Sequence, residues 1–470
     1  MKASIAADQI EEFPRVLKLR EKIAYGMGDV GNNFLFDMGQ LYLLKYFTDS
    51  VGLSPAVGGG VFLVAKFWDA FADVAVGTAI DHRKKIGKRG KFRPFILWAA
   101  LPLAILSIAN FSMPDFSVTL KEVWAYVAYI LFGTVYSISN IAYGSMQPAM
   151  TKNSVERSEL ASYRNIGANI GQLISTAAFM PIVLMLPTDR IGYMVAITIF
   201  SAAGVACQLF TYFNIKENYV EKKNSNEGKV NIKEILKSYK AVFKNGPLLI
   251  LCLANLFTFS AFNVIQAVQF YFAQYALHNI KIVSYMSLLT VGGGIVGSAI
   301  VPTVTKKIGK KYTYMIGCFI WFIADLLGFF LTNSGWSFAF FTTIAYFGNG
   351  LLSALNWALI SDVVEYGEWK THVRSEGIVY SSYTFFRKLS QAAAGLIPGV
   401  VLTFVGYVPN QAQTATSLLG IRSLVFLYPV IMAILTVIIM FFYPLNENRY
   451  AQIMDDLSTR RHGAKVETDE

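Results

Sequence analysis

Apolar stretches of about 20 residues recur along the whole chain and are separated by short polar segments. A helix rises about 1.5 Å per residue, so a stretch of about 20 residues spans the roughly 30 Å hydrocarbon core of a bilayer. With 54% hydrophobic and only 15% charged residues, the composition also lies outside the soluble range. We therefore expect an all-α membrane protein with twelve transmembrane helices. They cover residues 23–47, 59–80, 95–112, 124–147, 164–187, 192–214, 247–272, 282–303, 312–331, 336–360, 377–405 and 420–443.

The basic residues are distributed unevenly between the connecting segments. If the N-terminus is cytoplasmic, 33 of the 41 Lys and Arg residues fall on the cytoplasmic side, and the opposite connections hold only Lys121, Arg190 and Lys281. Cytoplasmic connections of membrane proteins are enriched in Lys and Arg. The pattern predicts a multi-pass protein of the cytoplasmic membrane with both termini in the cytoplasm. The net charge of +11 therefore reflects topology rather than binding to nucleic acid.

A short repeat relates the two halves of the chain. KIGK occurs at 85–88, after the second apolar stretch, and again at 307–310, after the eighth. Two six-helix halves joined by a charged connection are typical of major-facilitator transporters, whose substrate sites lie between the halves. The expected parts are an N-terminal bundle (1–214), a cytoplasmic middle loop (215–246), a C-terminal bundle (247–445) and a cytoplasmic tail (446–470).

Ionisable residues in the second stretch are the first candidates for a functional site. Lys66, Asp69 and Asp73 are spaced to share one face of a helix. Two carboxylates one turn apart repel unless a proton, a metal cation or a basic side chain lies between them. Charges inside a membrane are costly and mark ion or substrate pathways. The pair could therefore bind a coupling H⁺ or Na⁺, or Lys66 could simply neutralise one aspartate.

A second polar stripe lies in the first stretch and consists of Asn33, Asp37 and Gln40. Amides both donate and accept hydrogen bonds, which suits the hydroxyl groups of a sugar. The same amides could instead bond neighbouring helices. Asp37 is ionisable and lies deep in the stretch, so it favours a role in binding substrate.

Arg387 and Lys388 lie about ten residues into the eleventh apolar stretch, roughly 15 Å along a helix. Two adjacent cations at that depth need counter-charges. Asp37, Asp69 and Asp73 are the obvious ones. The first, second and eleventh helices should therefore face a common cavity.

Patterns that indicate an enzyme are weak in this sequence. GMGD at 26–29 matches one motif of intramembrane aspartyl proteases, but their Tyr-Asp motif in an earlier helix is missing. The glycine runs at 58–60 and 292–294 lack the GK[ST] of a phosphate-binding loop and are typical of close helix packing. We expect neither enzyme activity nor a resident cofactor or metal. A channel or receptor of similar helix count is the rival class, but acidic residues facing a deep basic pair favour an alternating-access cavity.

Seven segments spread over nearly the whole chain resemble signatures of the glycoside–pentoside–hexuronide cation symporters, the melibiose-permease-like family of major facilitators. They are GDVGNNF, YFTDSVGL, KFWDAFADV, GKFRPFIL, NIAYGSM, SDVVEYGEWKTHVRSEG and GYVPNQAQ. Within that family, TKNSVER and FFRK resemble the glucuronide and sulfoquinovose permeases. The resemblance implies two pseudo-symmetric six-helix bundles that carry a sugar or glycoside together with H⁺ or Na⁺. The expected partners are that small molecule and the lipid bilayer, without an obligate protein partner.

The resemblance also implies which residues bind the cation. The aspartates of the family's cation site fall on Asp69 and Asp73, and an associated hydroxyl falls on Ser137. The Asn that lies between the aspartates in melibiose permeases is Ala72 here. Because Na⁺ needs several oxygen ligands, the loss of this one favours H⁺.

The substrate site implied by the resemblance, together with the charges noted above, comprises Asn33, Asp37, Asn140, Arg164, Arg387 and Lys388. Asn33 and Asn140 stand where melibiose permeases carry two acidic residues, so the cavity here is more positive. Arg binds carboxylate or sulfonate groups bidentately. An acidic sugar, such as a hexuronide or a sulfonated hexose, is therefore expected. Neutral pentosides or oligosaccharides are the alternative, since amides also bind neutral hydroxyls.

A cytoplasmic gate is the last feature that the resemblance implies. In the family, charges that follow the tenth helix pair across the halves with charges between the fourth and fifth when the cytoplasmic side is closed. The residues here are Asp362, Glu365, Glu368 and Arg374 on one side and Arg157 on the other. Glu368 could equally be an ordinary solvated loop charge.

Overall fold

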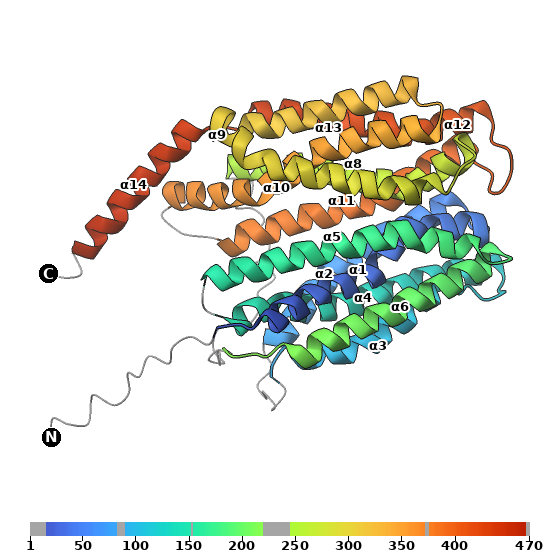
Figure 1. The fold of residues 1–470 in the computed structure, drawn as a ribbon, viewed down its shortest axis with the longest axis horizontal. Helices are drawn as coiled ribbons and strands as arrows, with labels where there is room; N and C mark the ends of the chain where they lie inside the picture. The colour runs from blue at the N-terminus through green and yellow to red at the C-terminus, as the bar shows by residue number, and fades with distance from the viewer. Residues whose placement is uncertain (1–15, 82–89, 152–153, 220–244, 372–375, 467–470) are drawn as a thin grey trace.

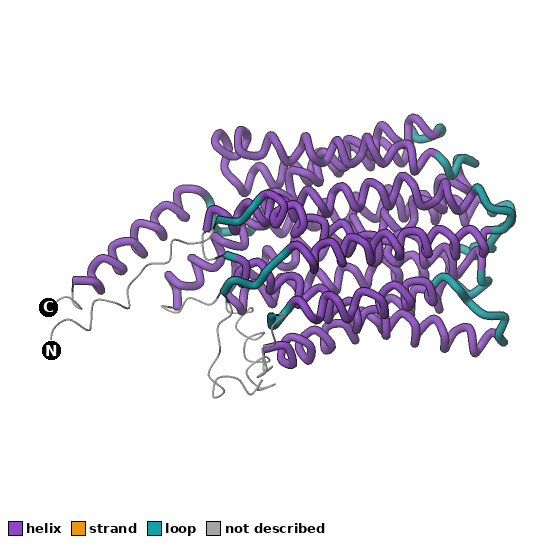
Figure 2. Tube along the Cα trace, turned by 60° about the horizontal axis from the view of Figure 1, so that its bottom comes forward, coloured by secondary structure: helices purple, strands orange, loops and turns teal. Residues whose placement is uncertain are grey.

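The computed structural model describes residues 16–81, 90–151, 154–219, 245–371 and 376–466. These residues form long helices joined by short loops (Figure 2). The first half contains α1 (Leu19–Lys45) with its π-helical extension η1 (Tyr46–Ser50), α2 (Pro55–Asp81), α3 (Arg93–Asn110), α4 (Val118–Met150), α5 (Ser154–Leu184) and α6 (Asp189–Asn214). The second half contains α8 (Gly246–Tyr271) with η2 (Phe272–Ala276), α9 (Ile282–Leu331), α10 (Gly335–Thr371), α11 (Glu376–Phe404), α12 (Ala415–Arg422), η3 (Ser423–Leu427) and α13 (Tyr428–Phe441).

All twelve apolar stretches expected from the sequence lie on helices of the structure. In the described part of the chain, eight helical segments are long and apolar enough to cross a membrane. One of them is α9, whose 50 residues contain two of the expected stretches. The helices α1, α2 and α11 fall outside this set. These three carry the intramembrane charges noted above, and such charges lower the hydropathy of a helix.

The same turn follows the second expected helix in each half. Gly309, at φ 82°, breaks α9 into two helices, and the amide that follows it donates to the carboxylate of Glu447 (2.8 Å). In the first half Gly90 has φ 88°, and Glu217 accepts from the backbone amides of residues 91–93. Both glycines adopt a left-handed conformation that other residues avoid. The first KIGK, at 85–88, lies outside the described residues, so the repeat itself stays a prediction.

The two halves lie side by side, with α1–α6 below and α8–α13 above in Figure 1, and the start of α1 lies at the same end of the molecule as α14 (Glu447–Val466). Near the other end, α2 packs directly on α11. A Cβ atom at Gly59 would come within 2.6 Å of the carbonyl oxygen of Gly395, so only glycine allows this approach. Gly293 lies equally close to the backbone of Thr343, within one half. Both glycine runs thus serve close packing, as predicted from the sequence.

A buried polar cluster joins the halves at the end opposite α14. Lys45 and Asp49 form an ion pair in which both side chains are almost completely buried. Tyr275 and Tyr407 of the second half donate to the Asp49 carboxylate, Tyr275 at 2.8 Å, and the Asn410 side chain donates to the Asp49 carbonyl at 2.6 Å. Separating the halves would remove these donors from the buried Asp49, and a buried polar group left without its partners is costly, so the cluster holds the halves together at that end.

The expected tail over 446–470 contains a further helix, α14 (Glu447–Val466), which extends away from the bundle (Figure 1).

Candidate functional site

Four charged side chains connect α2 of the first half to α11 of the second. Lys66 Nζ lies 3.3 Å from Asp69 Oδ2. Lys388 forms an ion pair with Asp73, and its Nζ also donates to the backbone carbonyl of Asp69 at 3.3 Å. Each aspartate is thus matched by one lysine, and one of the two pairs crosses between the halves.

Asp69 has an oxygen that is left without a hydrogen bond. Its Oδ1 is buried and accepts none from the described residues. It lies against Gly133 of α4, where a Cβ atom would collide with it. Ser137, also buried, follows Gly133 by one turn on the same helix. A buried carboxylate oxygen without a donor is costly, so this position suits a proton or a small cation.

An aromatic pair lies beside this cluster, next to two further charged residues. The ring of Phe36 lies 4.6 Å from Lys66 Nζ and stacks on Tyr136 at 4.5 Å. Asp37 directly follows Phe36 on α1, and Arg387 directly precedes Lys388 on α11. Neither the Asp37 carboxylate nor the Arg387 guanidinium forms a hydrogen bond or ion pair with another described residue. An anionic ligand could therefore bind Arg387 without displacing a described counter-ion.

Arg164 has a partner that the sequence analysis did not identify. Its guanidinium contacts Asp29 through Nε (2.8 Å) and Nη2 (3.4 Å) and lies 4.9 Å from the ring of Tyr143. The Tyr143 hydroxyl donates to the same carboxylate at 3.0 Å. Arg164 is thus already neutralised, and it is a weaker candidate than Arg387 for binding a substrate anion.

The amides of the first polar stripe bond neighbouring helices. Asn33 Nδ2 donates to the carbonyl of Ala168 on α5 (2.6 Å), and Gln40 Nε2 donates to the Tyr129 hydroxyl on α4 (2.8 Å). Of the two roles proposed from the sequence, the structure therefore shows helix packing for these donors. Asn140 is exposed, and its side chain forms no hydrogen bond with a described residue.

Three of the expected gate residues have contacts within their own half. Arg157 Nε donates to the Thr151 carbonyl at 3.0 Å. Lys310 binds both carboxylate oxygens of Asp362 at 2.7 Å. Glu365 accepts from Tyr450 of α14. Arg374 lies outside the described residues. Pairing across the halves, including any role of Glu368, stays a prediction.

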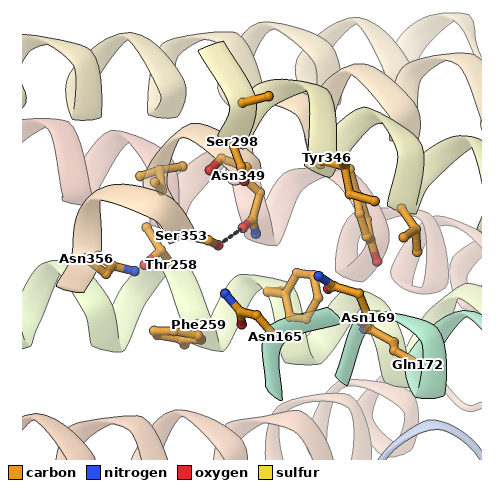
Figure 3. A pocket seen from close by; sticks show the side chains of 17 residues that line it. Asn165, Asn169, Gln172, Thr258, Phe259, Ser298, Tyr346, Asn349, Ser353 and Asn356 are labelled. Carbon is orange, nitrogen blue, oxygen red and sulfur yellow. Dashed lines mark hydrogen bonds between the residues drawn. The ribbon is translucent and has the colours of Figure 1, made fainter. Parts of the chain in front are cut away.

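A cavity of about 450 Å³ lies between α5 of the first half and α8, α9 and α10 of the second (Figure 3). The side chains of Asn165, Asn169 and Gln172 point into it from α5, and Asn349 and Asn356 approach from α10. The sequence analysis missed this cavity. The signal was an amide stripe on α5 at helical spacing, but only the folded structure brings the other three helices to it.

Comparison with known proteins identifies the family. The family described as MFS/sugar transport protein matches residues 24–447. The chain belongs to this family. Sugar transport by a multi-pass membrane protein is thus the activity of the family, and the resemblance to glycoside–pentoside–hexuronide symporters is confirmed.

Relatives within the family are similar over nearly their full length. A protein of Escherichia coli (strain K12) named as a sulfoquinovose importer is 45% identical over 447 residues, which are 95% of each chain. A protein of Salmonella typhimurium named as a 2,3-dihydroxypropane-1-sulfonate exporter is 45% identical over 458 residues, 97% of this chain and 99% of the other. A solved nucleoside transporter shares the fold, with a TM-score of 0.64, 15% identity, and coverage of 89% of this chain and 99% of its own.

Proposed function

We propose that this chain is a secondary active transporter that moves an acidic sugar, such as a hexuronide or a sulfonated hexose, across the cytoplasmic membrane together with H⁺. The observation that carries the proposal is Arg387, a guanidinium in a membrane helix without an anionic partner among the described residues. Its side chain is exposed, and ionisable residues in membrane helices mark substrate pathways. A carboxylate or sulfonate on the substrate would supply the missing counter-charge and bind bidentately.

The two relatives described above support the anionic class, because both are named for a sulfonate. One is named as an importer and the other as an exporter, at the same identity to this chain. Symport by alternating access is reversible, so its direction follows the gradients of the two solutes. We further propose twelve membrane spans with both termini in the cytoplasm, on the strength of the uneven distribution of Lys and Arg.

Two features support the proton as the coupled cation. Lysines already balance Asp69 and Asp73, so a Na⁺ ion would have to compete with an ammonium group. Ala72 in addition removes one oxygen ligand. A proton needs no ligand shell and can transfer to a carboxylate when its lysine moves away. We therefore propose that the coupling step occurs at the contact between α2 and α11.

A neutral pentoside or oligosaccharide is the second candidate substrate, and the amide-lined cavity favours it. None of the described residues that line this cavity is charged. Amides and hydroxyls bind neutral sugar hydroxyls without needing an acidic group.

The identity of the coupled cation is tested in proteoliposomes that hold the purified chain. Uptake of a labelled hexuronate is measured with an imposed pH gradient, acidic outside, and separately with an inward Na⁺ gradient at equal pH. We expect transient accumulation with the pH gradient alone, abolished by a protonophore. Accumulation that follows Na⁺ and survives the protonophore would refute proton coupling.

A further inference from the structure

Another cavity, of about 360 Å³, lies beside the turn at Gly309, where α9 is broken into two helices. Of the described residues that line it, one is acidic, Glu447, and four are lysines: Lys306, Lys307, Lys310 and Lys311. In the topology proposed above, this turn lies at the cytoplasmic surface of the membrane. The preference for Lys and Arg on that side explains why lysines occur here, but not why four of them line one cavity.

Two of these lysines are held in place by the protein. Lys310 Nζ binds both carboxylate oxygens of Asp362 at 2.7 Å. Lys311 Nζ donates to two backbone carbonyl oxygens at and just after the end of α13, at 2.8 and 2.7 Å. The Glu447 carboxylate accepts from the backbone amide of Lys310. The Lys311 ammonium group is thus fixed at the cavity without an acidic partner among the described residues.

The other two lysines, Lys306 and Lys307, are available to a ligand. Both are exposed, and neither side chain forms a hydrogen bond or ion pair with a described residue. Together with Lys311 they give the cavity three ammonium groups that no described carboxylate neutralises. Lysine binds phosphate oxygens as a point charge, without the fixed geometry that arginine requires. The cavity therefore suits a ligand that carries a phosphate group.

Exposed apolar side chains lie beside the cavity on the outer faces of α9 and α13. Tyr312 lines the cavity, and Ile316 follows it by one turn on the same exposed face of α9. On α13 the ring of Phe441 lies 5.8 Å from Lys311 Nζ, and Ile438 shares its exposed face. The two helices pack side by side (Figure 1). A phosphate in the cavity would thus have apolar surface next to it for acyl chains, which favours a lipid over a free phosphate.

We propose that this cavity binds the headgroup of an anionic phospholipid, whose acyl chains lie along α9 and α13. The cytoplasmic leaflet of a membrane carries a negative surface potential, and lysines at its surface are attracted to anionic lipids. The bound lipid would hold this end of the second half at the membrane surface. The site does not depend on which solute the protein transports, so its test is independent of the proposed substrate.

The test is lipid binding by the purified full chain in detergent, followed by native mass spectrometry. Phosphatidylglycerol is titrated in parallel with phosphatidylcholine of the same acyl chains. We expect the wild type to bind phosphatidylglycerol more tightly. In the double variant Lys306→Gln/Lys307→Gln, the dissociation constant for phosphatidylglycerol should rise about 10- to 30-fold, because each lysine near an anionic lipid contributes about fivefold.

The matched control is the double variant Arg20→Gln/Lys370→Gln. It removes the same charge from two exposed positions, at the start of α1 and the end of α10, and both lie outside the cavity. Its dissociation constant for phosphatidylglycerol should equal that of the wild type. The single variants Lys306→Gln and Lys307→Gln, each with an expected rise of about fivefold, test the site if the double variant does not fold.

Glycerol 3-phosphate, which carries the charge without acyl chains, is the competitor that distinguishes a lipid from a free phosphate. It should leave the binding of phosphatidylglycerol unchanged at equal concentration. Displacement at equal concentration would indicate a site for small anions and overturn the lipid assignment. Equal affinity of the wild type for the two lipids, or wild-type affinity in all the lysine variants, would overturn it as well.

Discussion

Asp73→Asn should abolish the accumulation of substrate against a gradient while leaving exchange of substrate across the membrane. Asp73 pairs with Lys388 across the halves, so the substitution leaves a partly buried ammonium without its counter-charge. It also removes a carboxylate that could accept the coupled proton. The measurement is uptake by energised vesicles compared with counterflow in the same vesicles.

Asp69→Asn should have the same effect, because it alters the second carboxylate of the cluster. Gly133→Ala tests the site without removing a charge, since its new methyl group would collide with Asp69 Oδ1. Gly292→Ala is the control, because a Cβ atom there meets no other group within 4 Å. If Asp69→Asn and Asp73→Asn both accumulate substrate like the wild type, the proposed cation site is wrong.

Arg387→Gln should raise KM for an acidic sugar by about 10- to 100-fold and KM for the matching neutral sugar by less than about threefold. A hydrogen bond to a charged group is worth about 1.5–3 kcal/mol, which is the basis of this difference. The guanidinium forms no ion pair with a described residue, so its removal leaves no described carboxylate unpaired. Initial rates for a hexuronate and its parent hexose give both values.

Arg164→Gln provides the comparison for this second prediction. It breaks the contact of Arg164 with Asp29, 2.8 Å in length, and so leaves a carboxylate uncompensated. We expect it to impair uptake of both sugars to a similar degree, because the lost contact disturbs the structure of the first half. A loss specific to the acidic sugar in Arg164→Gln, together with no such loss in Arg387→Gln, would move the anion site to Arg164.

The sequence predicts the helices well because the bilayer imposes their length and their apolar character. The cost of burying charge further predicts that Lys388 requires an aspartate, and the structure pairs it with Asp73. The fold alone, however, decides which aspartate is chosen and that Arg387 has no counter-ion among the described residues. Arg164 and Asp29 are 135 positions apart, and neither local spacing nor hydropathy relates them.

The amide-lined cavity shows that sequence patterns are equally limited in predicting the contacts of neutral residues. Hydropathy does not distinguish an Asn that bonds a neighbouring helix from one that faces a cavity. Asn33 belongs to the first kind and Asn169 to the second, although both lie at helical spacing in apolar stretches. The difference depends on which helices pack against α1 and α5. Such packing follows from three-dimensional contacts that the linear pattern does not contain.

The joint movement of an acidic sugar and a proton is tested most directly by a pH-sensitive dye trapped in proteoliposomes. With no pH or Na⁺ gradient, a hexuronate is added outside, and protein-free liposomes report any passive leak. We predict internal acidification with the wild-type chain, none with Asp73→Asn, and a much smaller response to the parent hexose. Entry of labelled hexuronate at unchanged internal pH, or a larger acidification with the neutral hexose, would contradict the account.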